Sequence, residues 1–314
     1  MAMKAKPFIK WVGGKNQLIE QLDALLPADF DNRKNVTYIE PFVGGGAMLF
    51  YMLQRYPNIK RAVINDINQD LICCYQTVRD FPEELIISLQ QVENEYRKLN
   101  TEELRKEYFM NVRAKYNQKN HDPIENTTLF FFLNRTCFNG LYRVNKSGAF
   151  NVPFGKYANP TICDIETIRA DSRLLQRVEI YQGDFESTFD YAEGDTLFYF
   201  DPPYRPLSDT SSFNDYTKES FNDDAQIRLK TYCDKINKAG YLFMLSNSDC
   251  KGKDETDNFF DILYRDYAID RVWASRNINA NPNKRGKLTE ILVHNYVQTK
   301  KVACEELFKL KLFA

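Results

Sequence analysis

The feature that most constrains the fold is an alternation of short apolar runs with longer helical patterns. Between the runs, residues 16–26, 46–55 and 223–239 place apolar side chains at helical spacing. Strands that alternate with helices favour an α/β fold with a mostly parallel sheet, whose ligands bind beyond the carboxyl ends of the strands. The runs that could form buried strands are residues 36–39, 62–64, 178–181, 196–200, 241–245 and 290–295.

The alternation stops between about residue 70 and residue 172. Residues 82–116 have the pattern of a helix, with Leu85, Leu89 and Val92 on one stripe. The sequence LFFFLNRTCFNGLYRVNKSGAFNVPFG follows; its start is typical of a buried helix, and its NKSG segment is typical of a turn in a β-hairpin. We therefore expect a mainly helical domain over residues 70–172, inserted into a sheet domain formed by residues 1–69 and 173–314.

The charge distribution is more informative than the total charge. The chain has 42 Lys and Arg and 43 Asp and Glu, a net charge of −1, whereas proteins that bind nucleic acids often carry a basic surplus. Residues 126–163 contain no acidic side chain but include Arg135, Arg143, Lys146 and Lys156. This stretch is either an ordinary solvated loop or a basic face for an anionic partner.

Cysteine and histidine usage argues against a metal site. The seven cysteines form no CxxC pair, and the chain has two histidines. We therefore expect neither a zinc site nor a disulfide framework, which fits reduced thiols in a cytoplasm. The sequence has no apolar run long enough to cross a bilayer and no apolar signal core, so membrane insertion and secretion are not expected.

The segment Asp201-Pro202-Pro203-Tyr204 follows an apolar run and should lie at the carboxyl end of a strand. Its residue types suit methylation of an adenine amine, which is conjugated to the ring and therefore a poor nucleophile. The Asp201 carboxylate and the Pro202 carbonyl can accept hydrogen bonds from both amine hydrogens and draw the nitrogen toward tetrahedral geometry. The prolines aim that carbonyl, and Tyr204 can stack on an extruded base. The alternative is a tight turn capped by Asp201.

A glycine-rich segment, EPFVGGG at residues 40–46, follows the first predicted strand. Its glycines would let the backbone approach a nucleotide-like ligand, with Glu40, Phe42 and Gly44 as candidate contacts. Asp66 follows the next strand, where a carboxylate can accept hydrogen bonds from ribose hydroxyls. The simpler interpretations are a strand-to-helix turn and a helix cap, and the order of the two motifs favours a cofactor site.

Two further segments are candidates for the same site. The glycines and lysines of KWVGGK, residues 10–15, lack the full phosphate-loop pattern, but the flat side chain of Trp11 could cover a cofactor. An N-terminal arm packed on the core would explain this segment equally simply. Asp184 ends another predicted strand and either faces the target base or caps the following turn.

Taken together in this order, KWVGGK, EPFVGGG, NDIN, CFNGLYR, FNVPFG, GDF and DPPY resemble the D12 class of DNA adenine methyltransferases. The sequence is especially similar to the Dam-type enzymes that modify GATC. The resemblance runs from Phe8 to about Tyr296, and KWVGGK with CFNGLYR is its most specific part. Tetrapeptides related to DPPY also serve other amino-group methyltransferases. The glycine motif reads VGGG where many relatives have a different small residue.

The resemblance implies a Rossmann-like, S-adenosylmethionine-dependent methyltransferase sheet with an inserted target-recognition domain. It implies cofactor contacts at Trp11, Lys15, Asp66 and Asp201, with Glu40, Phe42, Gly44 and Asp184 nearby, the last beside the target base. Asn139, Leu141 and Arg143 would enter DNA with the turn around Lys146, and Lys10 would reach a flanking guanine. Phe213 and Tyr216 would belong to the family's mobile loop after DPPY.

The expected activity is therefore transfer of a methyl group from S-adenosylmethionine to N6 of adenine in double-stranded DNA, within GATC and with the base flipped out. No metal is expected, and a restriction endonuclease could be a genetic partner without physical contact. One alternative is a methyltransferase that acts on RNA or on a protein amide, which the basic inserted stretch disfavours. The other is a DNA-binding relative without catalysis, which the intact DPPY and glycine motifs disfavour.

Overall fold

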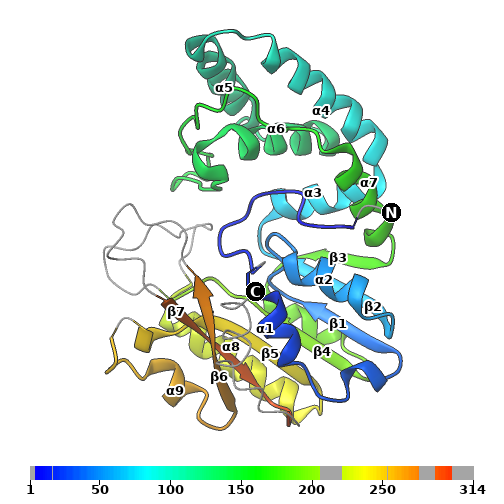
Figure 1. The fold of residues 1–314 in the computed structure, drawn as a ribbon, viewed down its shortest axis with the longest axis vertical. Coiled ribbons are helices and arrows are strands. Elements are labelled where there is room, and N and C mark those ends of the chain that lie inside the picture. The colour runs from blue at the N-terminus through cyan, green and yellow to red at the C-terminus, as the bar shows by residue number, and fades with distance from the viewer. Residues whose placement is uncertain (1–3, 16, 206–220, 253, 276–286, 299–314) are drawn as a thin grey trace, which may run out of the picture.

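The protein is built from a twisted sheet with helices on both faces and a helical part at one end (Figure 1). The computed structural model describes residues 4–15, 17–205, 221–252, 254–275 and 287–298; Phe213 and Tyr216 lie outside these residues. The described strands form a seven-stranded sheet in the order β3-β2-β1-β4-β5-β7-β6. They are β1 (Val36–Glu40), β2 (Ile59–Asp66), β3 (Val178–Gln182), β4 (Thr196–Phe200), β5 (Leu242–Ser248), β6 (Ala268–Ser275) and β7 (Lys287–His294).

The sheet reverses its winding between β1 and β4. From β1 the chain moves outward to β2 and β3, and from β4 it moves to β5 on the other side, all in parallel. The ends of β1 and β4 lie side by side, with Ile39 opposite Phe198. Such a reversal leaves a crevice beyond the strand ends where ligands of α/β sheets bind. β7 runs antiparallel to β5 and β6.

The alternation of side chains along the strands divides the core between the two faces. In β4, Leu197 and Tyr199 join a core with α1, α2, α3 and α7, whereas Phe198 and Phe200 join a second core with α8 and α9. The helices are α1 (Ile19–Ala24), α2 (Ala47–Arg55), α3 (Gln69–Asp80), α4 (Pro82–Arg97), α5 (Glu102–Tyr116), α6 (Pro123–Thr136), α7 (Ile165–Leu175), α8 (Asp223–Lys238) and α9 (Phe259–Leu263). Short 3-10 helices are η1 (Phe30–Asn32), η2 (Phe138–Gly140), η3 (Phe185–Tyr191) and η5 (Cys250–Gly252).

The predicted strands are all present, and one strand was missed. β6 was not predicted because its sequence, AIDRVWAS, mixes charged and apolar residues. This composition fits an edge strand, which in the described sheet pairs only with β7. The prediction of one helix over residues 82–116 was wrong: α4 ends at Arg97, and α5 begins after Thr101, whose hydroxyl accepts a hydrogen bond from Leu104 N at 3.2 Å.

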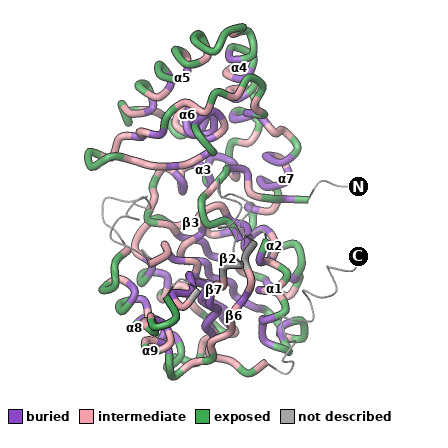
Figure 2. Tube along the Cα trace, turned by 60° about the vertical axis from the view of Figure 1, so that its left-hand side comes forward, coloured by how far each residue is buried: buried purple, intermediate pink, exposed green. Residues whose placement is uncertain are grey.

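The helical part is organised around α6, the predicted buried helix. α6 packs against α3, α4 and α5, and its residues Thr127–Asn134 are buried. Figure 2 shows buried residues along the strands and α6, with most exposed residues of the helical part on α4 and α5. α3 contacts both α6 and the strands β2 and β3, so one apolar core continues from the sheet into the helical part. The division at residues 70 and 172 therefore stays a prediction.

The predicted β-hairpin is a chain reversal without regular strands. Asn145 N donates to Ala149 O at 2.9 Å, and Asn151 N donates to Arg143 O at 3.1 Å. The remaining pairing consists of two isolated bridges, Cys137 with Phe154 and Val144 with Phe150. The NKSG turn thus forms where the sequence predicts it, but the flanking segments are too briefly paired to count as strands.

Candidate active site

A cavity of about 1570 Å³ opens beyond the carboxyl ends of β1 and β4. The N-terminal arm, the dark blue trace of Figure 1, passes between the sheet and the helical part and closes one side of it. Residues from opposite ends of the sequence therefore meet at the switch point of the sheet. The predicted residues that line the cavity are Lys10, Trp11, Lys15, Glu40, Phe42, Gly44, Asp66, Asn139, Asp184, Asp201, Pro202 and Tyr204.

The innermost wall of the cavity is a cluster of charges around Lys15. Its side chain, from the N-terminal arm, places Nζ 2.9 Å from Asp201 Oδ1 and 3.2 Å from Glu290 Oε2. The same ammonium donates to the Tyr204 hydroxyl. Lys15 is only 4% exposed, so its charge is held by these partners and not by water.

Burial and the neighbouring charges shift the pKa values of this cluster in opposite directions. Burial raises the pKa of Asp201 to about 6, against the attraction of Lys15. Burial alone would lower the pKa of Lys15, but Asp201 and Glu290 hold it above its usual value. At neutral pH the cluster therefore contains an ionised Asp201 beside an ammonium.

Glu290 is a member of this cluster that the sequence did not indicate. It lies near the start of β7, opposite Ser248 of β5. Because β7 is antiparallel, its first residues lie at the edge where the parallel strands end, beside Asp201. A glutamate beside an apolar run does not by itself indicate a functional residue. Only its ion pair with Lys15 places Glu290 in the site.

The glycine segment and Trp11 form the second wall. Gly44 and Gly46 have φ angles of +47° and +72°, which favour glycine. A Cβ atom at Gly44 would lie 2.9 Å from Trp11 Cδ1, so the indole packs directly on the glycine backbone. Residues 10–15 were interpreted either as a cover for a cofactor or as an arm packed on the core. Trp11 is compatible with both interpretations, since it packs on the core and also lines the cavity.

Asp66 ends β2 beside this segment and is both a cap and a cavity residue. Its two carboxylate oxygens accept hydrogen bonds from Gly44 N at 3.1 Å and Asn68 N at 2.9 Å. Burial raises its pKa to about 6, although these backbone N–H groups lower it. The carboxylate therefore fixes the glycine segment as well as lining the cavity.

Glu40 and Asp184 have partners within the protein. Glu40 is buried, accepts a hydrogen bond from the Tyr38 hydroxyl at 2.9 Å, and has a pKa that burial raises well above its usual value. Asp184 accepts from Glu186 N at 3.0 Å, so it caps η3, and it also pairs with Arg228 of α8. Arg228 lines the cavity too and was not predicted.

One part of the cavity wall is an apolar patch. The rings of Phe42 and Phe185 pack against each other with their centroids 5.3 Å apart, and Phe42 meets Phe221 edge-on at 5.7 Å. All three line the cavity together with Ile67. The patch thus offers an apolar surface against which a flat ring could pack.

The outer rim joins the N-terminal arm to the FNG turn of η2. The buried Asn134 side chain accepts from Lys10 N at 2.8 Å and donates to Gly140 O at 3.0 Å. A side chain at Gly140, whose φ is +65°, would overlap Lys10. Asn139 has a φ of +54° and is exposed. Lys10 and Asn139 thus both line the cavity, and their contact with DNA stays a prediction.

The remaining predicted residues, Leu141, Arg143 and Lys146, lie beyond this rim. Arg143 Nε donates to Asn151 Oδ1 at 2.7 Å, and Lys146 is exposed. Between Leu141 and Arg143, the ring of Tyr142 stacks on Trp11 at 5.4 Å with 25° between the planes. The segment that carries Arg143 is therefore in direct contact with the wall of the cavity.

Neither a metal centre nor a membrane span is found in the part of the chain that the structure describes. There, no group of three or more His, Cys, Asp or Glu side chains could hold a metal ion. The described helices are all too short or too polar to cross a membrane.

Known proteins with similar sequences are named as type II methyltransferases or DNA adenine methylases. A family model described as D12 class N6 adenine-specific DNA methyltransferase matches residues 11–278. The chain is 46% identical to type II methyltransferase M.MjaIII of Methanocaldococcus jannaschii, over 94% of this chain and 100% of that protein. It is 38% identical to type II methyltransferase M1.LlaDCHI of Lactococcus lactis, over 93% and 95%. A DNA adenine methylase of Vibrio cholerae is 33% identical, over 92% and 95%.

Proposed function

The chain belongs to the D12 class of N6-adenine-specific DNA methyltransferases, and on this premise we propose that it methylates N6 of adenine in duplex DNA, within GATC, using S-adenosylmethionine. The seven-stranded sheet is consistent with a methyltransferase fold. The observation that carries the proposal is that Asp201 and Tyr204 share one cavity with the glycine segment and Asp66.

The second wall of the cavity fits S-adenosylmethionine. The indole of Trp11 packs directly on Gly44, so a ligand against this wall would meet the indole and the rest of the glycine segment that lines the cavity. Asp66 offers carboxylate oxygens for ribose hydroxyls, and the apolar patch of Phe42 and Phe185 offers a surface for an adenine ring. Bound there, S-adenosylmethionine would supply an electrophilic methyl group on a positively charged sulfur. The carboxylates of Asp201 and Glu290 would stabilise that positive charge electrostatically.

The innermost wall would act on the target adenine. Asp201 and the Pro202 carbonyl accept hydrogen bonds from the two amine hydrogens, which makes the nitrogen lone pair available. Tyr204 stacks on the extruded base. One oxygen of Asp201 is already bonded to Lys15, so Lys15 and Glu290 orient this carboxylate before the base arrives. Asp184 lines the same cavity beside Phe185 and would contact the cofactor or the base.

The outer rim would hold the DNA. Residues 70–172 would form the target-recognition domain, with Lys10, Asn139 and Leu141 at its contact with the duplex. Arg143 would read a guanine of GATC through the two major-groove acceptors of that base. The GATC assignment is supported by the Dam-type motifs and by the similarity to proteins named DNA adenine methylase.

Labelled methyl transfer to defined substrates tests the proposal. The set contains a duplex with one GATC, the duplexes with each single substitution in that site, the duplex already methylated at N6, and RNA of the same sequence. We expect incorporation into the unmodified GATC duplex alone. Comparable incorporation at unrelated adenines would refute GATC, and incorporation into RNA alone would refute DNA as the substrate.

A further inference from the structure

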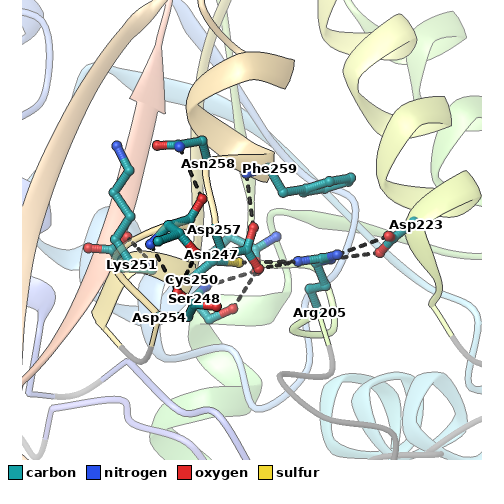
Figure 3. A network of polar contacts seen from close by, with 12 residues as sticks. Arg205, Asp223, Asn247, Ser248, Cys250, Lys251, Asp254, Asp257, Asn258 and Phe259 are labelled. Atoms are coloured by element: carbon teal, nitrogen blue, oxygen red, sulfur yellow. Dashed lines mark hydrogen bonds and ion pairs between the residues drawn. The ribbon is translucent and has the colours of Figure 1, made fainter.

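Arg205 directly follows Tyr204 and links Asp223 to a polar network around Asp257 (Figure 3). Its Nε and Nη2 donate to the two carboxylate oxygens of Asp223 at 2.7 and 3.0 Å. Its Nη1 donates to Asp257 Oδ2 at 2.7 Å, and the guanidinium lies 4.2 Å from the centroid of the Phe259 ring. Every nitrogen of this guanidinium is therefore engaged.

The network joins three segments that are separate in the sequence. Arg205 follows the end of β4, Asp223 is the first residue of α8, and Asp257 precedes α9. The Arg205 side chain is 20% exposed, and its two bonds to Asp223 are parallel, a geometry that lysine cannot reproduce. Among the described residues that line the cavity, Tyr204 is present and Arg205 is not.

The residue before Tyr204 is anchored to the same helix. The side chain of Gln226, on α8, donates to Pro203 O at 3.2 Å. Gln226 is itself oriented by Asn247 Nδ2, which donates to its Oε1 at 3.1 Å, and both side chains are fully buried. The backbone is thus tied to α8 on both sides of Tyr204, through Pro203 and through Arg205.

We propose that Arg205 is a positioning residue for methyl transfer: together with Gln226 it fixes the backbone that aims the Pro202 carbonyl and the Tyr204 ring at the target adenine. This inference rests on the proposed function. Arg205 does not contact substrate, so its contribution is to geometry. Misplacement of a reacting group by about 1 Å typically costs on the order of 100-fold in rate.

The test compares Arg205→Lys with Arg61→Lys. Arg61 is a matched control because it also makes two bonds to one carboxylate, Glu179 at 2.6 and 3.0 Å, and a third to Tyr191 O at 2.6 Å. It lies on β2, away from the cavity. Asp223→Asn removes the ionic partner without changing size, and serves if Arg205→Lys fails to fold.

We expect both lysine variants to lower the thermal midpoint, but only Arg205→Lys to lower the single-turnover methylation rate, by about 10- to 100-fold. The affinities for duplex DNA and for S-adenosylhomocysteine should stay within about twofold, because their proposed contacts are intact. Equal single-turnover rates for the two variants would overturn the inference. A loss that lies entirely in DNA or cofactor affinity would also overturn it.

Amide hydrogen exchange gives a readout that needs no activity. Exchange of the Asp201, Tyr204 and Arg205 amides should be faster in Arg205→Lys than in Arg61→Lys, each compared with the unaltered protein; Pro202 and Pro203 have no amide hydrogen. Unchanged exchange there would overturn the inference whatever the rates are. An unaltered protein that methylates no DNA would instead refute the proposed function, so the two failures are distinguishable.

Discussion

On the inner wall of the cavity the charged side chains are buried or half-buried and paired with each other, whereas the cations beyond the outer rim are half-buried or exposed and form no ion pair with a described residue. Lys15 lies between Asp201 and Glu290 with almost no access to water. Beyond the rim, Lys146 is exposed, and the guanidinium of Arg143 is bonded to the side chain of Asn151, which is neutral.

The difference follows from the solvation of charge. A charge removed from water needs a partner within the protein, so the inner wall must be assembled before any substrate binds. An exposed cation is already solvated, so it can exchange water for a phosphate or a base edge when DNA arrives. The comparison predicts that inner-wall variants lose rate or cofactor affinity, and that variants beyond the rim lose discrimination or DNA affinity.

The largest effect is expected for Asp201→Ala. Removal of a preorganised contact to the reacting group should lower the methyl transfer rate by about 100- to 1,000-fold. Asp195→Ala is the matched control, because Asp195 precedes β4 as Asp201 follows it and pairs with Arg33 at the opposite end of the strand. Single-turnover rates measure the effect. Near-normal turnover in a folded Asp201→Ala protein would contradict the mechanism.

Asp66→Ala should weaken cofactor binding more than DNA binding. Hydrogen bonds to a charged group contribute roughly 1.5–3 kcal/mol each, or about 10- to 150-fold in affinity. Calorimetry with S-adenosylhomocysteine measures the loss. Asp164→Ala is the control, since Asp164 also caps a helix, accepting from Thr167 N at 3.1 Å, but does not line the cavity. If the two variants bind equally well, Asp66 is a cap alone.

Arg143→Ala tests the region beyond the rim. A bidentate contact to guanine is worth about 1–3 kcal/mol, so discrimination at one outer position of GATC should fall roughly 5- to 150-fold. Lys146→Ala is the comparison, and it should weaken binding to all sequences evenly and reduce the salt slope by about one. Methylation rates on GATC and its single substitutions separate the two effects. A uniform loss in Arg143→Ala would make Arg143 a phosphate contact.

The smallest effect is expected from pH. Burial raises the pKa of Asp201 to about 6, and only the ionised carboxylate can accept hydrogen bonds with both oxygens. The single-turnover rate should therefore be level above pH 7 and fall about tenfold per unit below pH 6. Discrimination between sequences should not change, because the proposed contact of Arg143 with guanine does not involve Asp201. A rate independent of pH from 5 to 8 would contradict a mechanism in which Asp201 has a pKa of about 6 and must be ionised.

Short-range patterns in the sequence were sufficient for most of the fold. The parallel strands, the glycine segment and the position of DPPY at a strand end follow from periodicity and from residues adjacent in the chain. The predictions of secondary structure were wrong where the local sequence was compatible with more than one structure. Residues 82–116 keep a helical pattern across the break at Thr101, and the charged residues of β6 conceal an edge strand.

The sequence by itself determined the chemistry offered at the strand ends: a carboxylate and a constrained carbonyl at DPPY, flexible backbone at EPFVGGG, and a carboxylate at Asp66. Only the tertiary structure decided which side chains support them, namely Glu290 beside Lys15 and Arg205 between Asp223 and Asp257. The physical reason is that the state of a charged side chain depends on its burial and on the groups packed against it, and folding brings those groups from distant parts of the chain.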